Sequence, residues 1–165
     1  MTVEEKKRLH SPKHEERRAK AAIAEWLRRF LIVPNIYFDA AWQPKRTLDV
    51  LAIDRAGSGD VHAVEVKAVY THNDLVQARK LLLTTPANYT WLALVAEPGV
   101  ELPVPPLALL NPGGMGRIGL IRIEPGPGES PVASIQYKAE RFAGSLYDRA
   151  DRFTKKHKPD LQTRP

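Results

Sequence analysis

Two apolar segments joined by a short turn constrain this chain more than any other part of its sequence. They read TLDVLAID, from Thr47 to Asp54, and VHAVEVKAV, from Val61 to Val69. Their aliphatic and β-branched content predicts two strands that helices cover on both faces. Three charged residues nevertheless interrupt the apolar pattern: Asp49 in the first segment, and Glu65 and Lys67 in the second. Charges inside buried strands call for a chemical reason.

These three charged residues are expected to lie together. Side chains alternate between the two faces of a strand, so Glu65 and Lys67 share one face, and Asp49 lies on the neighbouring strand. An ionised group buried in a core is costly unless it is paired or binds a metal ion. Two carboxylates can hold a hard cation such as Mg²⁺, and a lysine beside it can orient a water molecule. Hydrolysis of a phosphodiester requires these parts.

Hydrophobic periodicity predicts the remaining elements. A helix over residues 14–31 follows from an apolar stripe at spacings of three and four residues. Two more helices are expected at Asn73–Leu83, with Asn73 as its cap, and at Lys138–His157. Further strands are expected at Ile36–Ala41, Tyr89–Ala96, Arg117–Ile123 and Val132–Lys138.

The order of these elements predicts an α/β fold, with a mixed β-sheet flanked by helices. The core order is α-β-β-β-α-β, followed by extra strands and a C-terminal helix, and the second helix makes a right-handed crossover. With 165 residues, we expect a single domain over residues 14–157. A basic arm at residues 1–13 precedes it, and a disordered tail at residues 158–165 follows it.

Composition excludes several classes of site. The chain has no cysteine, which removes disulfides, thiolate zinc sites and a cysteine nucleophile. No apolar run approaches the length of a membrane span, and the charged N-terminus lacks the apolar core of a secretion signal. We therefore expect a cytoplasmic protein with no membrane partner.

The net charge of +6 is concentrated at the two ends of the chain. Residues 1–29 carry nine Lys/Arg and five Glu, and residues 149–165 carry six Lys/Arg and two Asp, so each end has a net charge of +4. Such ends are typical of arms that contact nucleic-acid phosphates, with Lys155, Lys156 and Lys158 as candidates. Basic termini that only solubilise the chain are the alternative.

The pattern Asp49, fifteen residues, then Glu65-Val66-Lys67 resembles the PD-(D/E)xK nuclease superfamily. That superfamily includes restriction endonucleases, Holliday-junction resolvases and recombination nucleases, and the resolvase and repair branch is the most similar. The resemblance implies a restriction-endonuclease-like fold and a Mg²⁺ (or Mn²⁺) cofactor. It also implies that Asp49, Glu65 and the Val66 carbonyl are metal ligands, and that Lys67 orients the attacking water.

The resemblance covers roughly residues 14–96, and more loosely the strand around Gly119–Ile121. Leu48 stands where the superfamily pattern has a proline, so this chain departs from the pattern at one position.

Many such nucleases place a further glutamate on the first helix. At about 100° per residue, Glu16 lies roughly 45° from the centre of the apolar stripe and Glu15 roughly 55° from it, whereas Glu25 faces solvent. Glu16 is therefore the first candidate for the site, and Glu15 the second. A solvated glutamate that only stabilises the first turn of the helix is the alternative.

The second helix offers Gln77, Arg79 and Lys80 as contacts to the site or to DNA, because some relatives use a glutamine there. Ordinary exposed helix residues are the alternative for all three. His62 alternates to the face opposite Glu65, so it is not placed in the site.

Two main hypotheses for the function follow. The first is a metal-dependent nuclease that acts on DNA in repair, recombination or restriction, with a homodimer as one way to cut two strands. The second is a non-catalytic nucleic-acid-binding protein with the same fold. A weaker third hypothesis is a protein-interaction domain whose basic ends bind an acidic partner.

Overall fold

The computed structural model describes residues 12–30, 35–54, 59–102, 109–111, 116–124, 131–142 and 144–162. Residues 1–11 of the expected basic arm lie outside this part of the chain. So do residues 55–58 of the expected turn between the two apolar strands, and much of the loop expected after the fourth strand.

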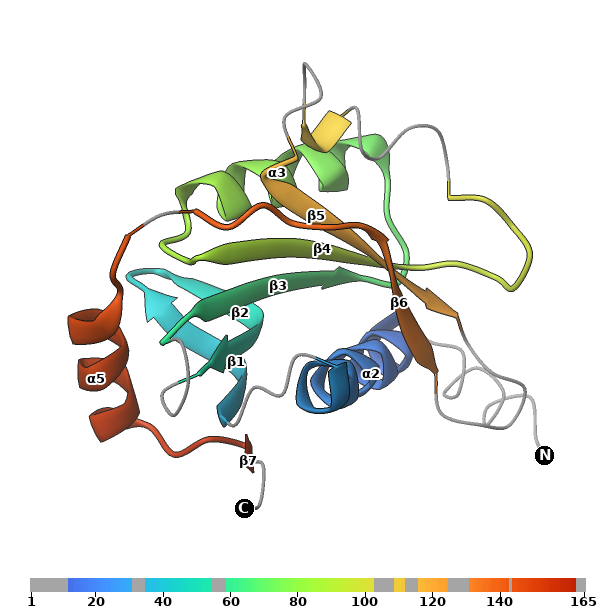
Figure 1. Cartoon of the computed structure of the whole chain (residues 1–165). Coiled ribbons are helices and arrows are strands. Elements are labelled where there is room, and N and C mark those ends of the chain that lie inside the picture. The colour runs from blue at the N-terminus through green and yellow to red at the C-terminus, as the bar shows by residue number, and fades with distance from the viewer. Residues whose placement is uncertain are drawn as a thin grey trace.

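The described residues form a seven-stranded mixed sheet with helices on its faces (Figure 1). The strands are β1 (Asn35–Gln43), β2 (Arg46–Ile53), β3 (Val61–Lys67), β4 (Tyr89–Val95), β5 (Ile118–Glu124), β6 (Val132–Tyr137) and β7 (Leu161–Gln162). Their order is β6-β5-β4-β3-β2-β1-β7, with β3, β4 and β5 parallel and the other neighbours antiparallel. The helices are α2 (Pro12–Phe30), α3 (His72–Thr84) and α5 (Tyr147–Lys156). The predicted α/β class and core order are confirmed.

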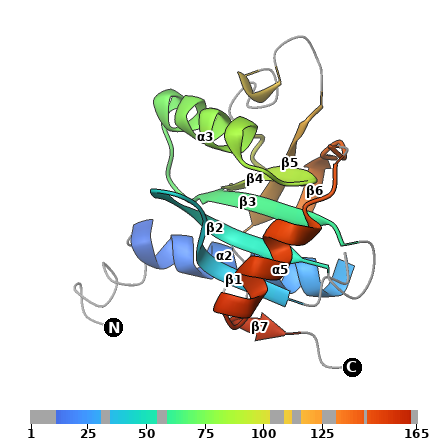
Figure 2. The same ribbon diagram turned by 90° about the vertical axis from the view of Figure 1, so that its left-hand side faces the viewer.

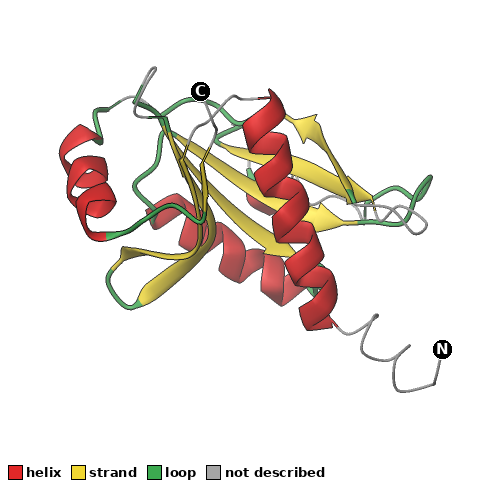
Figure 3. Cartoon of the chain, turned by 90° about the horizontal axis from the view of Figure 1, so that it is seen from below, coloured by secondary structure: helices red, strands yellow, loops and turns green. Residues whose placement is uncertain are grey.

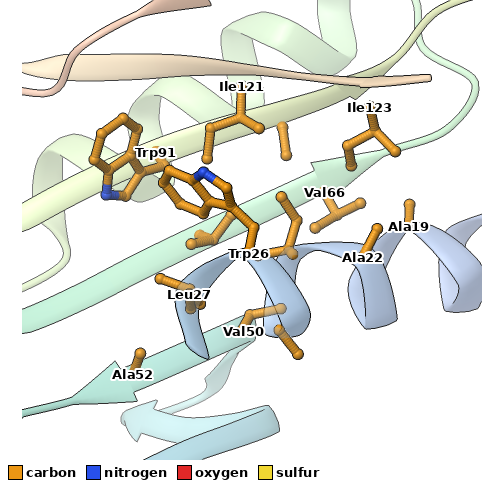
Figure 4. Close-up of a cluster of buried hydrophobic side chains, with 14 of the residues drawn as sticks. Ala19, Ala22, Trp26, Leu27, Val50, Ala52, Val66, Trp91, Ile121 and Ile123 are labelled. Atoms are coloured by element: carbon orange, nitrogen blue, oxygen red, sulfur yellow. The ribbon is translucent and has the colours of Figure 1, made fainter. Parts of the chain in front are cut away.

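Helix α2 lies across one face of the sheet (Figure 3). Its apolar stripe packs on side chains of β2 to β5, and the Trp26 and Trp91 rings meet edge to face with their centres 5.3 Å apart (Figure 4). Gly119 on β5 leaves room for Trp91, because a Cβ atom there would clash with its ring and with the Ala139 backbone. This face of the core is therefore closely packed and apolar.

The opposite face is covered in two parts (Figure 2). Helix α3 packs on β4 and β5 through leucines such as Leu82 and Leu92. Helix α5 packs on the β1–β2 end, where the Phe153 ring meets the rings of Tyr37 and Trp42 edge to face. Strand β3 is thus buried on both sides, as its sequence predicts. No helix among the described residues is long and apolar enough to span a membrane.

Helix α3 begins with a capping box centred on Thr71. The Thr71 hydroxyl accepts a hydrogen bond from the Asp74 N–H at 3.2 Å, and the Asp74 carboxylate accepts one from the Thr71 N–H at 2.8 Å. The prediction of Asn73 as the cap was therefore wrong by two residues. Reciprocal bonds between the Thr71 and Asp74 positions satisfy two backbone donors, which a cap at Asn73 does not.

The C-terminal helix is shorter than predicted, because it begins at Tyr147 rather than at Lys138. The chain before it is held by backbone hydrogen bonds to distant segments, from Glu140 N–H to Gly116 O and from Phe142 N–H to Asn88 O. Gly144 adopts a φ of +144°, which does not continue a right-handed helix.

The prediction of disorder from residue 158 onward was wrong for residues 158–162. Leu161–Gln162 forms β7 beside β1. Asp160 also accepts a hydrogen bond from the Phe38 N–H at 2.7 Å and donates its own N–H to the Ile36 carbonyl. Edge pairing with β1 orders this segment. Residues 163–165 lie outside the described part of the chain.

Candidate active site

The ladder between β2 and β3 ends at the pair of Val50 and Val64, and two carboxylates continue the hydrogen bonding beyond it. The Asp49 Oδ2 atom accepts the Val66 N–H at 2.7 Å, and the Glu65 Oε1 atom accepts the Asp49 N–H at 3.2 Å. Side-chain oxygens thus satisfy backbone donors where the two strands separate. The structure brings Asp49 and Glu65 together in this gap.

The β1–β2 hairpin opens this gap by curling away from the rest of the sheet (Figure 3). Its register shifts between Ala40 and Gln43, as in a β-bulge. Asp39, which lies between the pairs that flank Asp49, has a φ of +47°, in the left-handed region that aspartate tolerates. This backbone turn brings the Asp39 carboxylate toward α2.

Lys20 on α2 ties three carboxylates together. Its Nζ atom lies 2.7 Å from Asp39 Oδ1, 3.5 Å from Asp49 Oδ1 and 3.8 Å from Glu16 Oε1. The Lys20 side chain is 16% exposed and that of Asp49 17%, whereas the Glu16 and Asp39 side chains are exposed, so only the Lys20–Asp49 part of the network is shielded from water. Sequence reasoning missed both Lys20 and Asp39. The available signals were the four-residue spacing of Lys20 from Glu16 and an aspartate inside the apolar strand IYFDAAW.

Burial and the Asp49 charge set the protonation of Glu65. The Glu65 residue is only 6% exposed. Burial raises the pKa of its carboxyl group to about 8, and the negative charge of Asp49 adds to the rise. The hydrogen bond from the Asp49 N–H and the positive charge of Lys67 act in the opposite direction without offsetting it. Without a cation between them, Glu65 therefore holds a proton at neutral pH next to Asp49.

The two lysines of the site have different surroundings. Burial works to lower the pKa of Lys20, but its hydrogen bond to Asp39 and the charges of Asp49, Asp39 and Glu16 together raise it. Lys67, the last residue of β3, is half-buried and forms no ion pair with any residue that the structure describes. Its ammonium is therefore available to another group.

The three glutamates of α2 are placed as follows. Glu16 joins the site through Lys20 and borders a pocket of about 400 Å³ that Arg17 and Asp39 also line. Glu15 is half-buried. Glu25 is exposed and forms ion pairs with Arg28 and Arg29, so it faces away from the site.

The α3 candidates lie on the outer part of that helix. Gln77 and Lys80 are exposed. The Arg79 Nε atom donates to the Leu110 carbonyl at 3.2 Å, which gives this side chain a structural partner. The three do not join the carboxylate network.

The C-terminal candidates Lys155, Lys156 and Lys158 are all exposed. Lys155 forms an ion pair with Asp151 at 2.9 Å, one turn earlier on α5. Helix α5 packs on the face of the β1–β2 end opposite α2 (Figure 2), so these lysines form a surface separate from the Lys20 network.

His62 is buried on the face opposite Glu65, as the alternation of β3 predicts. Its Nδ1 atom accepts a hydrogen bond from Trp91 Nε1 at 3.3 Å, and its ring stacks on Tyr89 with the centres 4.6 Å apart. Burial lowers the pKa of His62 to about 4, against the charges of Asp60 and Asp54. It is a neutral core residue.

The donor set at the gap fits a magnesium ion better than a transition metal. Within the described residues, no group of three or more His, Cys, Asp or Glu side chains is arranged to hold a metal ion. Magnesium is usually bound by one or two carboxylates, with water and substrate phosphate supplying the other ligands. Asp49 and Glu65 would hold such an ion, and a cation there favours the ionised form of Glu65.

Comparisons with known proteins inform the fold alone. No protein-family model and no curated protein matches this chain. Among solved structures, SPO1766, a protein of unknown function from Silicibacter pomeroyi, matches with a TM-score of 0.58 and 17% sequence identity. The match covers 86% of this chain and 82% of that one. The argument for function therefore depends on the chemistry of the site.

Proposed function

We propose that this protein hydrolyses phosphodiester bonds of DNA with Mg²⁺ or Mn²⁺, in the manner of PD-(D/E)xK nucleases. The proposal depends on the pair Asp49 and Glu65, because each carboxylate accepts a hydrogen bond from the backbone of the other's strand. Lys67 follows at the end of β3. Glu65 is buried with a raised pKa beside the half-buried Asp49, and the Lys67 ammonium near them has no ion-pair partner among the described residues. They suit a cation and an anionic substrate.

Each side chain then has a separate task. Asp49 and Glu65 would hold the ion, which would supply positive charge to the phosphate group when bound. Lys67 orients the attacking water and stabilises charge on the phosphate. The water oxygen forms a bond to phosphorus and loses a proton to solvent, while the bond from phosphorus to a deoxyribose oxygen breaks and that oxygen takes up a proton from solvent.

Lys20 is a positioning residue in this scheme. Its ammonium lies within ion-pair distance of both Asp39 and Asp49, so it helps to fix the direction of the Asp49 carboxylate. Glu16 and Asp39 in turn hold Lys20. The carboxylate pair is thereby oriented from α2 and β1 as well as from β3.

A cleavage assay tests the proposal. The protein is mixed with single-stranded, duplex, flapped and four-way-junction DNA, and with RNA, in Mg²⁺, Mn²⁺, Ca²⁺ or EDTA. We expect cutting in Mg²⁺ or Mn²⁺, none in EDTA, and loss of cutting in Lys67→Ala. Lys138→Ala, an exposed lysine outside the site, is the matched control.

Binding without cutting on every substrate would overturn the nuclease and favour a non-catalytic nucleic-acid-binding protein. The preferred substrate would show whether repair, recombination or restriction is the better description, and cutting of RNA alone would correct the substrate class. Sedimentation with and without DNA would show whether the active form is a homodimer. We further propose that the protein is cytoplasmic.

A further inference from the structure

A second pocket, of about 620 Å³, lies at the turn of the β1–β2 hairpin, between the end of α3 and the start of α5. Three arginines from three segments line it: Arg46 on β2, Arg117 before β5, and Arg149 on α5. None of the described residues that line it is acidic. Within the described chain, none of the three arginines forms an ion pair with a carboxylate.

Aromatic rings fix the planes of two of these guanidinium groups. The Arg149 group lies 5.0 Å from the centre of the Trp42 ring and donates from Nη2 to the Trp42 carbonyl at 2.6 Å. The Arg117 group lies 4.1 Å from the centre of the Phe142 ring. A guanidinium held over an aromatic ring is pre-oriented, which favours binding of an oxyanion by its remaining N–H groups.

The same two groups have buried donors that no described residue satisfies. The Nε atoms of Arg117 and Arg149 are inaccessible to solvent and have no hydrogen-bond partner within the described chain. Burial and the charge of Arg152 also lower the pKa of Arg149. Cationic groups gathered without a carboxylate partner are unfavourable, and one anion bound in the pocket would offset their charges.

We propose that this pocket binds a phosphate group, with Arg46, Arg117 and Arg149 as its ligands. Arg46 is three residues before Asp49, so their Cα atoms lie at most about 11 Å apart. The pocket and the carboxylate pair thus both involve strand β2, and we infer that the phosphate belongs to a nucleic-acid strand. This assignment to a DNA strand rests on the proposed function, whereas the phosphate site itself does not.

Nuclear magnetic resonance of the arginine Nε–H groups tests the phosphate site directly. Inorganic phosphate is titrated into the full-length, ¹⁵N-labelled protein. We expect saturable shifts of the Arg117 and Arg149 Nε–H signals, and loss of both shifts in Arg46→Gln. Sulfate distinguishes a general oxyanion site from a phosphate site. No shift at phosphate concentrations that saturate other arginine signals would overturn the proposal.

Affinity for a short single-stranded oligonucleotide, measured in EDTA so that nothing is cut, separates the two sources of phosphate. We expect Arg46→Gln and Arg117→Gln each to weaken binding about tenfold or more. Lys45→Gln is the matched control, because Lys45 adjoins Arg46 in the same turn, carries the same charge and does not line the pocket. Equal weakening in all three variants would mean that only net charge matters, and would overturn the pocket as a DNA site.

The two proposals fail in different ways. Phosphate shifts at Arg117 and Arg149 without oligonucleotide binding would keep the phosphate site and count against its use for DNA. Oligonucleotide binding that depends on the pocket, but with no cutting in Mg²⁺, would keep the pocket and overturn the nuclease.

Discussion

The two ends of β3 each bury an ionisable side chain, but the protein treats them differently. Near the start of the strand, His62 is 7% exposed and is satisfied by the Trp91 N–H and by stacking on Tyr89. Near its end, Glu65 is 6% exposed and lies against Asp49, a second carboxylate. Burial drives each group to its neutral form, lowering the pKa of His62 to about 4 and raising that of Glu65 to about 8.

The difference shows that burial alone does not mark a functional residue. Both groups have strongly shifted pKa values, but only Glu65 lies beside another carboxylate and near a half-buried lysine at the end of its strand. The His62 ring stacks on Tyr89, and its Nδ1 atom accepts a hydrogen bond from Trp91. Its neutral form therefore serves the packing of the core. The neighbours of a buried ionisable group therefore indicate whether its pKa shift reflects a structural or a catalytic role.

The largest expected effect concerns cleavage. Glu65→Gln should lower Mg²⁺-dependent cutting of DNA on the order of 10³-fold, because it removes one ligand charge from the site. His62→Asn should leave the cutting rate within about twofold and lower the melting temperature by a few degrees, because it loses the stacking on Tyr89 and perturbs the hydrogen bond from Trp91, away from the carboxylate pair. The same cleavage assay with a thermal melt measures both. Equal loss of activity in the two variants would break the distinction between the two ends of β3.

The next effect is on the pH dependence of stability, where the two ends have opposite signs. The pKa of Glu65 is raised from 4.5 to about 8, so its contribution to stability is full below pH 4.5 and is lost progressively as the pH rises toward 8. The pKa of His62 is lowered from 6.5 to about 4, so its contribution is full above pH 6.5 and is lost as the pH falls toward 4.

Urea unfolding across this pH range separates the two contributions. The free energy of unfolding of Glu65→Gln should exceed that of the wild type by more at pH 8 than at pH 5. The free energy of unfolding of His62→Asn should fall furthest below that of the wild type at pH 6.5 and above. Curves that run parallel to the wild type from pH 4 to pH 8 would contradict both shifts. Added Mg²⁺ should flatten the Glu65 slope, because it binds the ionised carboxyl group.

The smallest effect concerns Lys20. Its ammonium lies 3.5 Å from Asp49 and competes with any other cation for that carboxylate. Lys20→Met should therefore tighten Mg²⁺ binding several-fold, as measured by calorimetry without DNA, while the cutting rate falls because Asp49 is less well oriented. Lys138→Met is the exposed control. Unchanged or weaker Mg²⁺ binding would show that Lys20 supports the ion instead of competing with it.

Local pattern predicted the elements that depend on local contacts. Strands β1 to β6 were placed within about two residues of their observed ends, as with Tyr89–Ala96 for β4, whereas β7 was not predicted. The predicted start of the C-terminal helix was wrong because residues before Tyr147 are hydrogen-bonded to Gly116 and Asn88, which are distant in sequence. Periodicity reports which face of a segment is apolar, and it does not report which distant backbone groups compete for that segment.

The candidate site divides in the same way. Asp49, Glu65 and Lys67 were found from the sequence because a charge inside an apolar strand is visible without any structure. Lys20 and Asp39 were missed because each is ordinary in its own segment. Their roles depend on the bend of the β1–β2 hairpin and on where α2 crosses the sheet.

The sequence by itself therefore determined the fold class, the position of β3 in the core and the two carboxylates that are costly to bury. Strand alternation and helix periodicity involve neighbours a few residues apart, so both can be recognised in the sequence. Only the tertiary structure decided that Lys20 bridges Asp39 and Asp49, 19 and 29 residues away, and that three unpaired arginines share one pocket. Such convergence depends on how packed elements cross, and no local pattern encodes that geometry.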